Sequence, residues 1–280
     1  MRKKESIKVN DIQLVISEQI KNFGIIRRIS TYEEKATYQS HYLGLIWQFL
    51  NPAIQIGIYY LIFGLGVRGG REVQGVPFII WMLIGIIAWF FINSSILGCS
   101  NSIYKQVGMV SKMKFPVSIL PSVNMASNLV SYKWMMLLLV AAMVGFRVPI
   151  TIYWVQYVYY FVCMIAFLFA FGILNATITV LVRDYHIMLQ SILRLLFYLS
   201  GPIWDINTLV KSPHLSWLVG FLKLNPIYYI IEGFRDSFLS RQWFWEKPAQ
   251  TLFFWLVVFI LLTIGAHLHM KFRARFVDFI

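Results

Sequence analysis

Charged residues are scarce in this sequence. Asp, Glu, Lys and Arg make up 13% of its 280 residues, about half of the roughly 25% typical of soluble domains, whereas 59% are hydrophobic. A water-soluble domain of this composition would have no polar surface, so the composition predicts an integral membrane protein. The net charge of +13 does not indicate nucleic-acid binding, because Lys and Arg lie in short stretches between apolar runs and form no single basic stripe.

Residues that carry catalytic or metal chemistry are also rare. The two cysteines, Cys99 and Cys163, lie inside apolar runs, where a thiol behaves as a small hydrophobe, so neither a disulfide framework nor a zinc site is expected. The five histidines are scattered over different segments, and no H-E-x-x-H, C-x-x-C or G-x-S-x-G pattern occurs. The sequence therefore predicts no metal site and no catalytic residues.

A phosphate-binding loop for ATP is missing as well. The motif G-x-x-x-x-G-K-[ST] needs a lysine directly after its second glycine. Residues 64–69 and 70–75 have the glycine spacing, but Gly70 and Val76 stand where that lysine must be. The chain is therefore not predicted to be an ATPase, and if ATP drives this protein, another polypeptide binds the nucleotide.

Long apolar runs are abundant instead. A membrane-spanning helix needs about 20 mostly apolar residues. Six stretches meet this requirement, namely residues 45–67, 77–99, 118–146, 152–182, 187–205 and 249–269. With both termini in the cytoplasm, 15 Lys and Arg fall on the inner side, and the short outer loops hold Arg68, Arg71 and Arg147, which fits the positive-inside rule. We therefore expect an all-α, multi-pass plasma-membrane protein with six transmembrane helices and a single domain, residues 1–280.

Residues 1–41 form a cytoplasmic region without a transmembrane run. Ile12, Val15, Ile16, Ile20 and Phe23 repeat at helical spacing and make one apolar stripe on a polar helix. Such an amphipathic helix is expected to lie on the inner membrane face. A helix that packs against the bundle without anchoring it fits the same stripe.

Residues 206–248 hold a seventh apolar run, 215–239, which we do not interpret as a span. Asn225-Pro226 interrupts this run, and Glu232 and Arg235 follow. Two short helices that dip into the outer leaflet without crossing fit the pattern, because broken backbone at membrane depth is tolerated where protein or a water-filled cavity covers it. We expect a re-entrant extracellular segment here.

Two cations lie inside predicted spans, Lys133 in the third and Arg194 in the fifth. A charge at membrane depth is costly and usually faces an interior, so either residue could line a path for an anionic substrate. Arg194 could equally snorkel towards the cytoplasm, and Lys133 could pair with backbone carbonyls or a neighbouring helix. No Asp or Glu lies in the middle of a predicted span, which disfavours proton-driven transport.

Aromatic residues make up 17% of the chain. Many fall at predicted span ends, Trp81 among them, and are expected in interfacial belts. Some in the span interiors are candidates for stacking on sugar rings along a substrate path, although packing alone explains each of them: Tyr59, Tyr60, Tyr132, Phe197 and Tyr198.

The loop 104–116 is expected on the cytoplasmic side. It is short, cationic and partly apolar, and a proline ends it. A protruding helix of this kind could receive a mechanical push from a separate ATPase, or the loop could be only a connector. The candidate coupling residues are Lys105, Lys112, Lys114, Phe115 and Pro116.

Six segments together resemble the ABC-2 family of exporter permeases. They are Tyr42–Pro52, Lys112–Pro116, Arg183-Asp184, Phe197–Pro202, Asn225–Arg235 and Phe272–Asp278. Each is weak alone, but they follow one another in the family's order over the whole chain. They are similar to the polysaccharide branch, which includes permeases for wall teichoic acid and for O-antigen, and residues 42–66 resemble the Gram-positive teichoic acid permease in particular.

The resemblance implies a homodimer bound to two copies of an ABC ATPase subunit, which would hold ATP and magnesium, while this chain carries no cofactor. It implies export of a lipid-linked anionic polysaccharide, such as wall teichoic acid on undecaprenyl pyrophosphate, to the cell exterior. The loop 104–116 would dock on the ATPase. The re-entrant segment would gate the exit, and its candidate gate residues are Pro202, Asn225, Pro226, Glu232 and Arg235.

Other functions fit parts of the sequence. Export of an O-antigen-like glycan, or of a drug or small lipid, would use the same fold and the same kind of partner. A transferase acting on lipid-linked sugars would need a clustered acid or base at membrane depth, which the predicted spans lack. A passive channel would need no ATPase.

Overall fold

The computed structural model of the chain describes residues 9–39, 42, 44, 46–67, 69–106, 116–182, 184–207 and 216–276. Within these ranges the regular structure is helical, apart from one isolated bridge between Val73 and Val76, and this confirms the predicted all-α class. In chain order the elements are α1 (Val9–Lys21), α2 (Phe23–Gln39), α3 (Ile46–Tyr59), the π-helix η1 (Tyr60–Val67), α4 (Phe78–Lys105), η2 (Val117–Ile119), α6 (Leu120–Gly145), η3 (Ile152–Val155), α7 (Gln156–Leu181), α8 (Tyr185–Leu199), α9 (Ser216–Lys223), α10 (Pro226–Phe238), η5 (Phe244–Glu246), α11 (Pro248–Phe272) and η6 (Arg273–Arg275).

Within the described ranges, five helical stretches are long and apolar enough to cross a membrane. They are Leu50–Val67, Phe78–Lys105, Val117–Gly145, Ile152–Leu181 and Pro248–Arg275. Each falls on one of the predicted spans, and the chain is a multi-pass membrane protein.

The sixth predicted stretch, 187–205, corresponds to α8, which is apolar but has only 15 residues. The sequence-based span was too long because it ran through a turn. Gly201 has a φ angle of +64°, the left-handed conformation that commonly ends helices, and Pro202 follows it. The regular helix therefore stops at Leu199.

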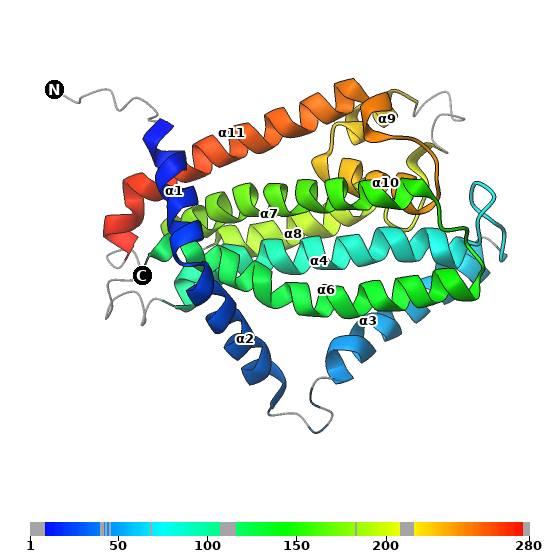
Figure 1. The fold of residues 1–280 in the computed structure, drawn as a ribbon, viewed down its shortest axis with the longest axis horizontal. Helices are drawn as coiled ribbons and strands as arrows, with labels where there is room; N and C mark the ends of the chain where they lie inside the picture. Colours follow the sequence, from blue (N-terminus) through cyan, green and yellow to red (C-terminus); the bar gives the residue numbers. More distant parts are fainter. Residues whose placement is uncertain are drawn as a thin grey trace.

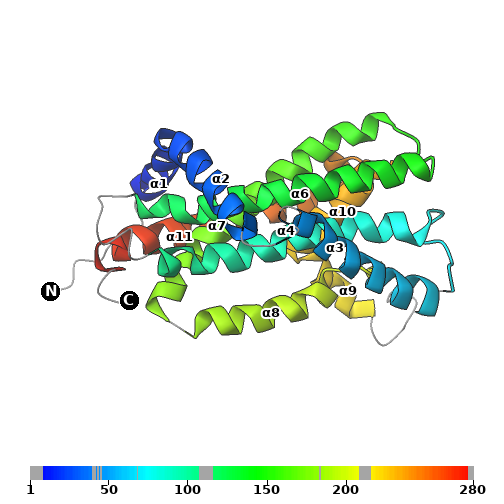
Figure 2. The same cartoon turned by 90° about the horizontal axis from the view of Figure 1, so that it is seen from below.

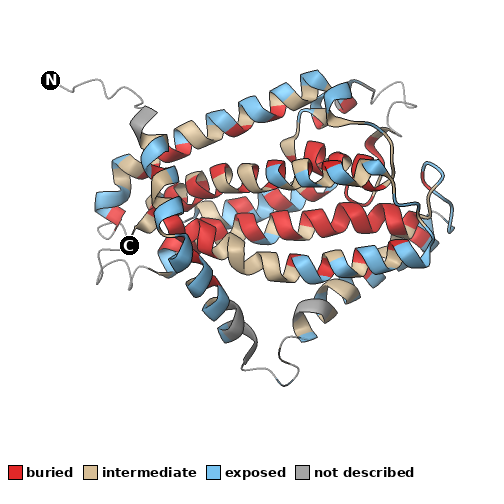
Figure 3. Cartoon of the chain, in the orientation of Figure 1, coloured by how far each residue is buried: buried red, intermediate tan, exposed pale blue. Residues whose placement is uncertain are grey.

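Helix α4 forms the centre of the bundle. It packs against α6, α7, α8 and α10 and is buried along most of its length (Figure 3). Its side chains are apolar on nearly all faces, as expected of a helix with neighbours on every side. Helices α6 and α8 lie on opposite sides of it (Figure 2).

The bundle has two ends, which we name after α1 and α10. Helix α7 ends and α8 begins at the α1 end, and α8 runs back to the end where α9 and α10 lie (Figure 1). At the α1 end, Nδ1 of His267 lies 3.0 Å from Oδ2 of Asp11, and Nη1 of Arg273 donates to Oε1 of Glu18 at 2.9 Å. Helix α1 and the last described turn of the chain therefore meet at the same end.

The apolar stripe of the N-terminal region is divided between two environments. Val15 is fully buried against Ile173 and Ala266, so α1 packs on the bundle. Ile20 and Phe23, by contrast, are 72% and 67% exposed. One side of α1 thus packs on the bundle, while Ile20 of α1 and Phe23 at the start of α2 keep an apolar surface that fits the predicted position at the membrane face.

The seventh apolar run does not form one long helix. It divides at Asn225, as the sequence predicts, into α9 and α10. All residues of α10 except Pro226 and Glu232 are buried, because the helix packs against α4 and α7. The close approach to α7 depends on Gly233, where an added Cβ would lie 2.1 Å from the ring of Tyr160.

Candidate functional site

Asn225 fixes the start of α10. Its Oδ1 accepts a hydrogen bond from the backbone N of Ile227 at 2.9 Å, which caps the helix, and Pro226 occupies the first helical turn, where no backbone donor is needed. Its Nδ2 donates to Oγ of Ser200 at 2.8 Å. One side chain therefore joins the beginning of α10 to the end of α8.

Arg235 joins α10 to two other segments of the bundle. Its Nη1 donates to Oε1 of Glu232 at 2.6 Å, and its Nη2 donates to the carbonyl oxygens of Gly201 and Pro202, each at 2.9 Å. The guanidinium carbon lies 3.3 Å from the ring centroid of Trp81 on α4, a cation–π contact. We call these five residues the Arg235 cluster.

The Arg235 cluster is buried, and its contacts compensate for part of that burial, whereas Nε of Arg235 and Nε1 of Trp81 have no hydrogen-bond partner within the described residues. The Arg235 side chain is 0% exposed, and burial lowers the pKa of its guanidinium, although the nearby Glu232 carboxylate acts in the opposite direction. A planar guanidinium with a carboxylate, two carbonyls and an aromatic face around it is a geometry that lysine cannot reproduce. Gly85 on α4 makes room, because a Cβ there would lie 2.5 Å from Nη2 of Arg235.

Trp81 shows where the sequence-based assignment was wrong. Its place near a predicted span end indicated an interfacial belt, but the side chain is fully buried beneath Arg235. A tryptophan at the start of a span has the same sequence signal in both cases. The distinction depends on α10, which the chain brings across α4 from about 150 residues away.

Charged side chains continue from Glu232 towards the loop after α10. Arg241 Nη1 lies 3.7 Å from Oε2 of Glu232, and Nζ of Lys247 donates to Oδ2 of Asp236. Burial raises the pKa of the Asp236 carboxyl to about 6, although the neighbouring Lys247 lowers it. The α10 end therefore holds a partly buried network of opposite charges.

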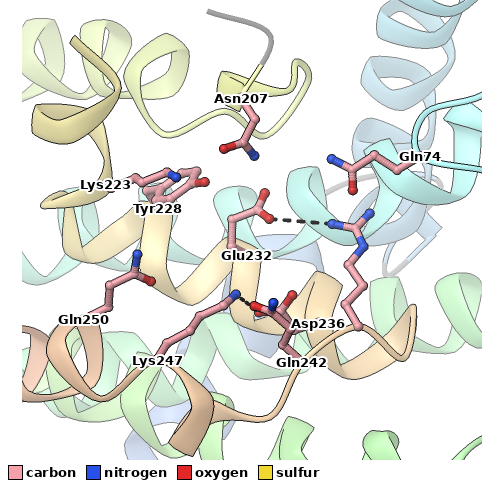
Figure 4. Close-up of a pocket in the computed structure, with 10 residues that line it drawn as sticks. Gln74, Asn207, Lys223, Tyr228, Glu232, Asp236, Gln242, Lys247 and Gln250 are labelled. Atoms are coloured by element: carbon pink, nitrogen blue, oxygen red, sulfur yellow. Dashed lines mark hydrogen bonds and ion pairs between the residues drawn. The ribbon is translucent and has the colours of Figure 1, made fainter. Parts of the chain in front are cut away.

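A polar cavity of about 480 Å³ lies beside this network (Figure 4). Its lining comes from the loop before α4, the turn after α8, helices α9 and α10, and the segment around η5. The lining residues are Gln74, Asn207, Lys223, Tyr228, Glu232, Asp236, Arg241, Gln242, Lys247 and Gln250. No sequence motif marks it, because its residues come from segments that are distant in the chain.

Three of the predicted path residues lie together on α3 and α8. The ring of Phe197 has centroid distances of 5.6 Å to Tyr59, 5.2 Å to Tyr198 and 5.4 Å to Trp89 on α4. Tyr198 is 57% exposed. Arg194, one turn earlier on α8, is exposed and donates to Oγ of Ser191 at 3.2 Å. Arg194 and Tyr198 therefore present a cationic and aromatic face on the surface of the described chain, while Phe197 lies buried.

Two other path candidates lie on α6, on the far side of α4 from α8. Tyr132 is buried, and its hydroxyl lies 3.0 Å from that of Tyr157. Lys133 is exposed beside an apolar groove between α6 and α7 and has no hydrogen-bond or ion-pair partner in the described part of the chain. The structure therefore does not bring Lys133 and Arg194 together (Figure 2).

The predicted coupling residues lie at the α1 end where they are described. Lys105 is the last residue of α4, and Pro116 directly precedes η2. Lys112, Lys114 and Phe115 fall outside the described residues.

Two carboxylates of the N-terminal helices accept hydrogen bonds from residues on either side of positions 107–115. On one flank, Nε2 of Gln106 donates to Oε1 of Glu33 on α2. On the other, Oγ of Ser118 donates to Oε2 of Glu18 on α1, and Nε2 of Gln19 donates to the carbonyl oxygen of Ser118 at 3.0 Å.

The chain is similar to known membrane proteins over most of its length. A family model described as ABC-2 type transporter matches residues 26–239. The O-antigen export system permease protein RfbA of Myxococcus xanthus is 25% identical over 230 residues, 82% of this chain and 85% of that protein. An RfbA of Klebsiella pneumoniae is 24% identical over 257 residues, 91% and 95% of the two chains, and the inner membrane transport permease YadH of Escherichia coli K12 is 27% identical over 217 residues, 75% and 81%.

Proposed function

Because this chain belongs to the ABC-2 type transporter family, we propose that it is the membrane permease of an ATP-driven exporter of a lipid-linked anionic polysaccharide. Members of this family are transport subunits and not catalytic ATPases, they carry no cofactor themselves, and they pair with an ABC ATPase. The observation that carries the substrate class is the similarity, over more than four fifths of the chain, to permeases named for O-antigen export. Wall teichoic acid is the polymer that the resemblance of residues 42–66 favours.

The proposed topology has six crossings with both termini in the cytoplasm. Five long helices alone would leave α1 and the C-terminal turn on opposite sides of the membrane, but these two segments are joined by Glu18 and Arg273. A sixth crossing, made by α8 together with the Gly201-Pro202 turn, gives an even number of crossings and places both segments on the same side of the membrane. The α10 end is then the outer end, and α9–α10 is the re-entrant segment.

The proposed assembly contains two copies of the chain and two ATPase subunits, with ATP and magnesium in the ATPases. Polar side chains at membrane depth rarely face lipid. The exposed Arg194 and Tyr198 on α8, with Tyr59 of α3, therefore support a substrate path between the two copies. Lys133 would contact substrate only if the α6–α7 groove also faced the path.

We propose that the Arg235 cluster keeps the exit closed. It ties α10 to α4 and to the turn after α8, so the re-entrant segment cannot move outwards without separating Arg235 from the carbonyls of Gly201 and Pro202. An ATP-driven push on the predicted coupling loop 104–116 would reach it along α4, which runs from one end of the bundle to the other (Figure 1).

Reconstitution tests the proposed function. The chain and its ABC ATPase are placed together in vesicles that hold an undecaprenyl-pyrophosphate-linked anionic glycan, and movement of the glycan across the bilayer is measured. We expect movement that requires ATP and both proteins. Movement without ATP indicates a channel, transport of a drug or small lipid but not of the glycan indicates the alternative exporter class, and ATP hydrolysis by the chain alone contradicts the proposal.

Replacement of Glu18 by Ala is expected to slow this export several-fold while leaving the fold intact. Glu18 holds both Ser118, next to the coupling segment, and Arg273. The Arg273 side chain is 42% exposed, and surface ion pairs contribute only up to about 1 kcal/mol to stability, so the main expected loss is in transmission of movement. The measurement compares ATP-driven export with the thermal unfolding midpoint. Gln13→Ala, at an exposed position of the same helix, is the matched control, and normal export by Glu18→Ala contradicts the role.

A further inference from the structure

The polar cavity at the α10 end has an excess of positive charge. Two carboxylates line it, and both already face cations: Glu232 lies near Arg235 and Arg241, and Asp236 accepts from Lys247. Lys223 lines the same cavity and has no ion-pair partner in the described part of the chain. Among the described lining residues the unpaired charge is therefore positive, which favours an anion over a metal cation as the ligand.

Arg241 offers a donor that the protein leaves unused. Its Nη2 is buried and has no hydrogen-bond partner within the ranges that the structure describes. A buried guanidinium donor without a partner is costly, so a small movement of the Arg241 side chain that brings this donor to an acceptor oxygen in the cavity would be favourable. Arginine also binds carboxylate and phosphate groups in a bidentate manner, which makes an oxyanion the natural acceptor.

The rest of the lining is rich in side-chain amides. Gln74, Asn207, Gln242 and Gln250 all reach the cavity, and two of these amides are held in place by one buried carboxylate. Oδ2 of Asp205 accepts from Nε2 of Gln74 at 2.7 Å, and its Oδ1 accepts from Nδ2 of Asn207 at 3.1 Å. Asp205 is 8% exposed.

Amides fixed in this way suit hydroxyl groups. An amide has both donors and acceptors, and a hydroxyl is at once a donor and an acceptor. Figure 4 shows Gln74 and Asn207 on a different side of the cavity from Lys223 and Gln250. A volume of about 480 Å³ lies in the range of small-molecule sites and accommodates a sugar residue with a charged substituent.

We propose that this cavity binds one saccharide unit that carries a phosphate or a carboxylate group. The oxyanion lies against Arg241, Lys223 adds to the positive potential of the same cavity, and the ring hydroxyls lie against the amides. The identity of the natural ligand as a unit of the emerging polymer rests on the proposed function, but binding itself needs neither ATP nor transport. The site would hold the emerging glycan on the outer side of the Arg235 cluster and oppose its movement back towards the membrane.

Binding of small probes tests the proposal. The full chain in lipid nanodiscs, free of sugar-based detergent, is titrated with glucose 1-phosphate, galacturonate, glucose and inorganic phosphate, and affinities are measured by saturation-transfer NMR. We expect both anionic sugars to bind more tightly than glucose and than inorganic phosphate. Arg241→Gln and Lys223→Gln should each weaken the anionic sugars about tenfold, the loss of roughly one charge-assisted hydrogen bond. Arg71→Gln, at an exposed position near the same end, should change nothing.

The outcomes separate this inference from the proposed function. Equal affinity for glucose and the anionic sugars, or unchanged affinity in both variants, overturns it. Phosphate alone binding as tightly as glucose 1-phosphate overturns the saccharide part. The inference fails alone if ATP-driven glycan export occurs without probe binding, and the proposed function fails alone if probes bind but no glycan moves. Lys223→Gln keeps the test valid if Arg241→Gln does not fold.

Discussion

Replacement of Arg235 by Met is expected to abolish export and to lower the free energy of unfolding by about 3–5 kcal/mol, the usual consequence of removing one partner of a buried ion pair. The variant leaves the Glu232 carboxylate without Arg235, its nearest cation. It also removes the donors to the carbonyls of Gly201 and Pro202, so the turn after α8 loses its attachment to α10. Thermal unfolding and glycan export, measured on the same preparation, check the two effects.

A double variant separates stability from gating. Glu232→Leu with Arg235→Met removes both charges, and replacement of a buried ion pair by apolar residues is often close to neutral for stability. We expect the unfolding midpoint to recover in part, while export stays lost because the two carbonyls still lack a donor. Recovery of export together with stability would show that the cluster has only a structural role. Arg235→Lys, which keeps the charge without the planar fork, should resemble Arg235→Met in export.

The sequence was sufficient for the elements that depend on local pattern. Five long apolar runs and the break at Asn225-Pro226 were predicted at nearly their observed places, because an apolar run and a proline act within a few residues. The sixth stretch was extended too far, since Gly201 ends α8 through a left-handed turn that hydrophobicity does not register.

The candidate site was predictable only in part. Asn225, Glu232 and Arg235 were identified because charge and proline are unusual inside an apolar run, and the structure brings them to one end of the bundle. Their partners Trp81 and Gly85 were not identified, because the local sequence around these two residues does not reveal a contact with a distant helix. The polar cavity was not predicted for the same reason, because its four amides come from three segments that are distant in the chain.

Replacement of Gly233 by Ala is expected to displace α10 from α7 and to destabilise the chain by about 1–3 kcal/mol or more, the range for overpacking a buried contact. A Cβ at this position would lie 2.1 Å from two ring atoms of Tyr160, far inside van der Waals contact. That ring cannot move aside, because Tyr160 is 1% exposed and its neighbours Tyr159 and Tyr229 have ring centroids at 5.2 and 5.5 Å.

The displacement of α10 should also disturb the contacts of Arg235 at the proposed exit. Arg235 lies two residues after Gly233 in the same helix, so a shift of the helix axis lengthens its hydrogen bonds to Gly201 and Pro202, and we expect glycan export to fall with the unfolding midpoint. The control is Gly220→Ala in α9, where an added Cβ meets nothing within 4 Å and alanine favours the helix by up to about 1 kcal/mol. Its midpoint should stay level or rise. If Gly233→Ala behaves like Gly220→Ala, the close packing of α10 on α7 is wrong, and the attachment of the re-entrant segment to the bundle must then depend on Arg235 and Asn225 alone.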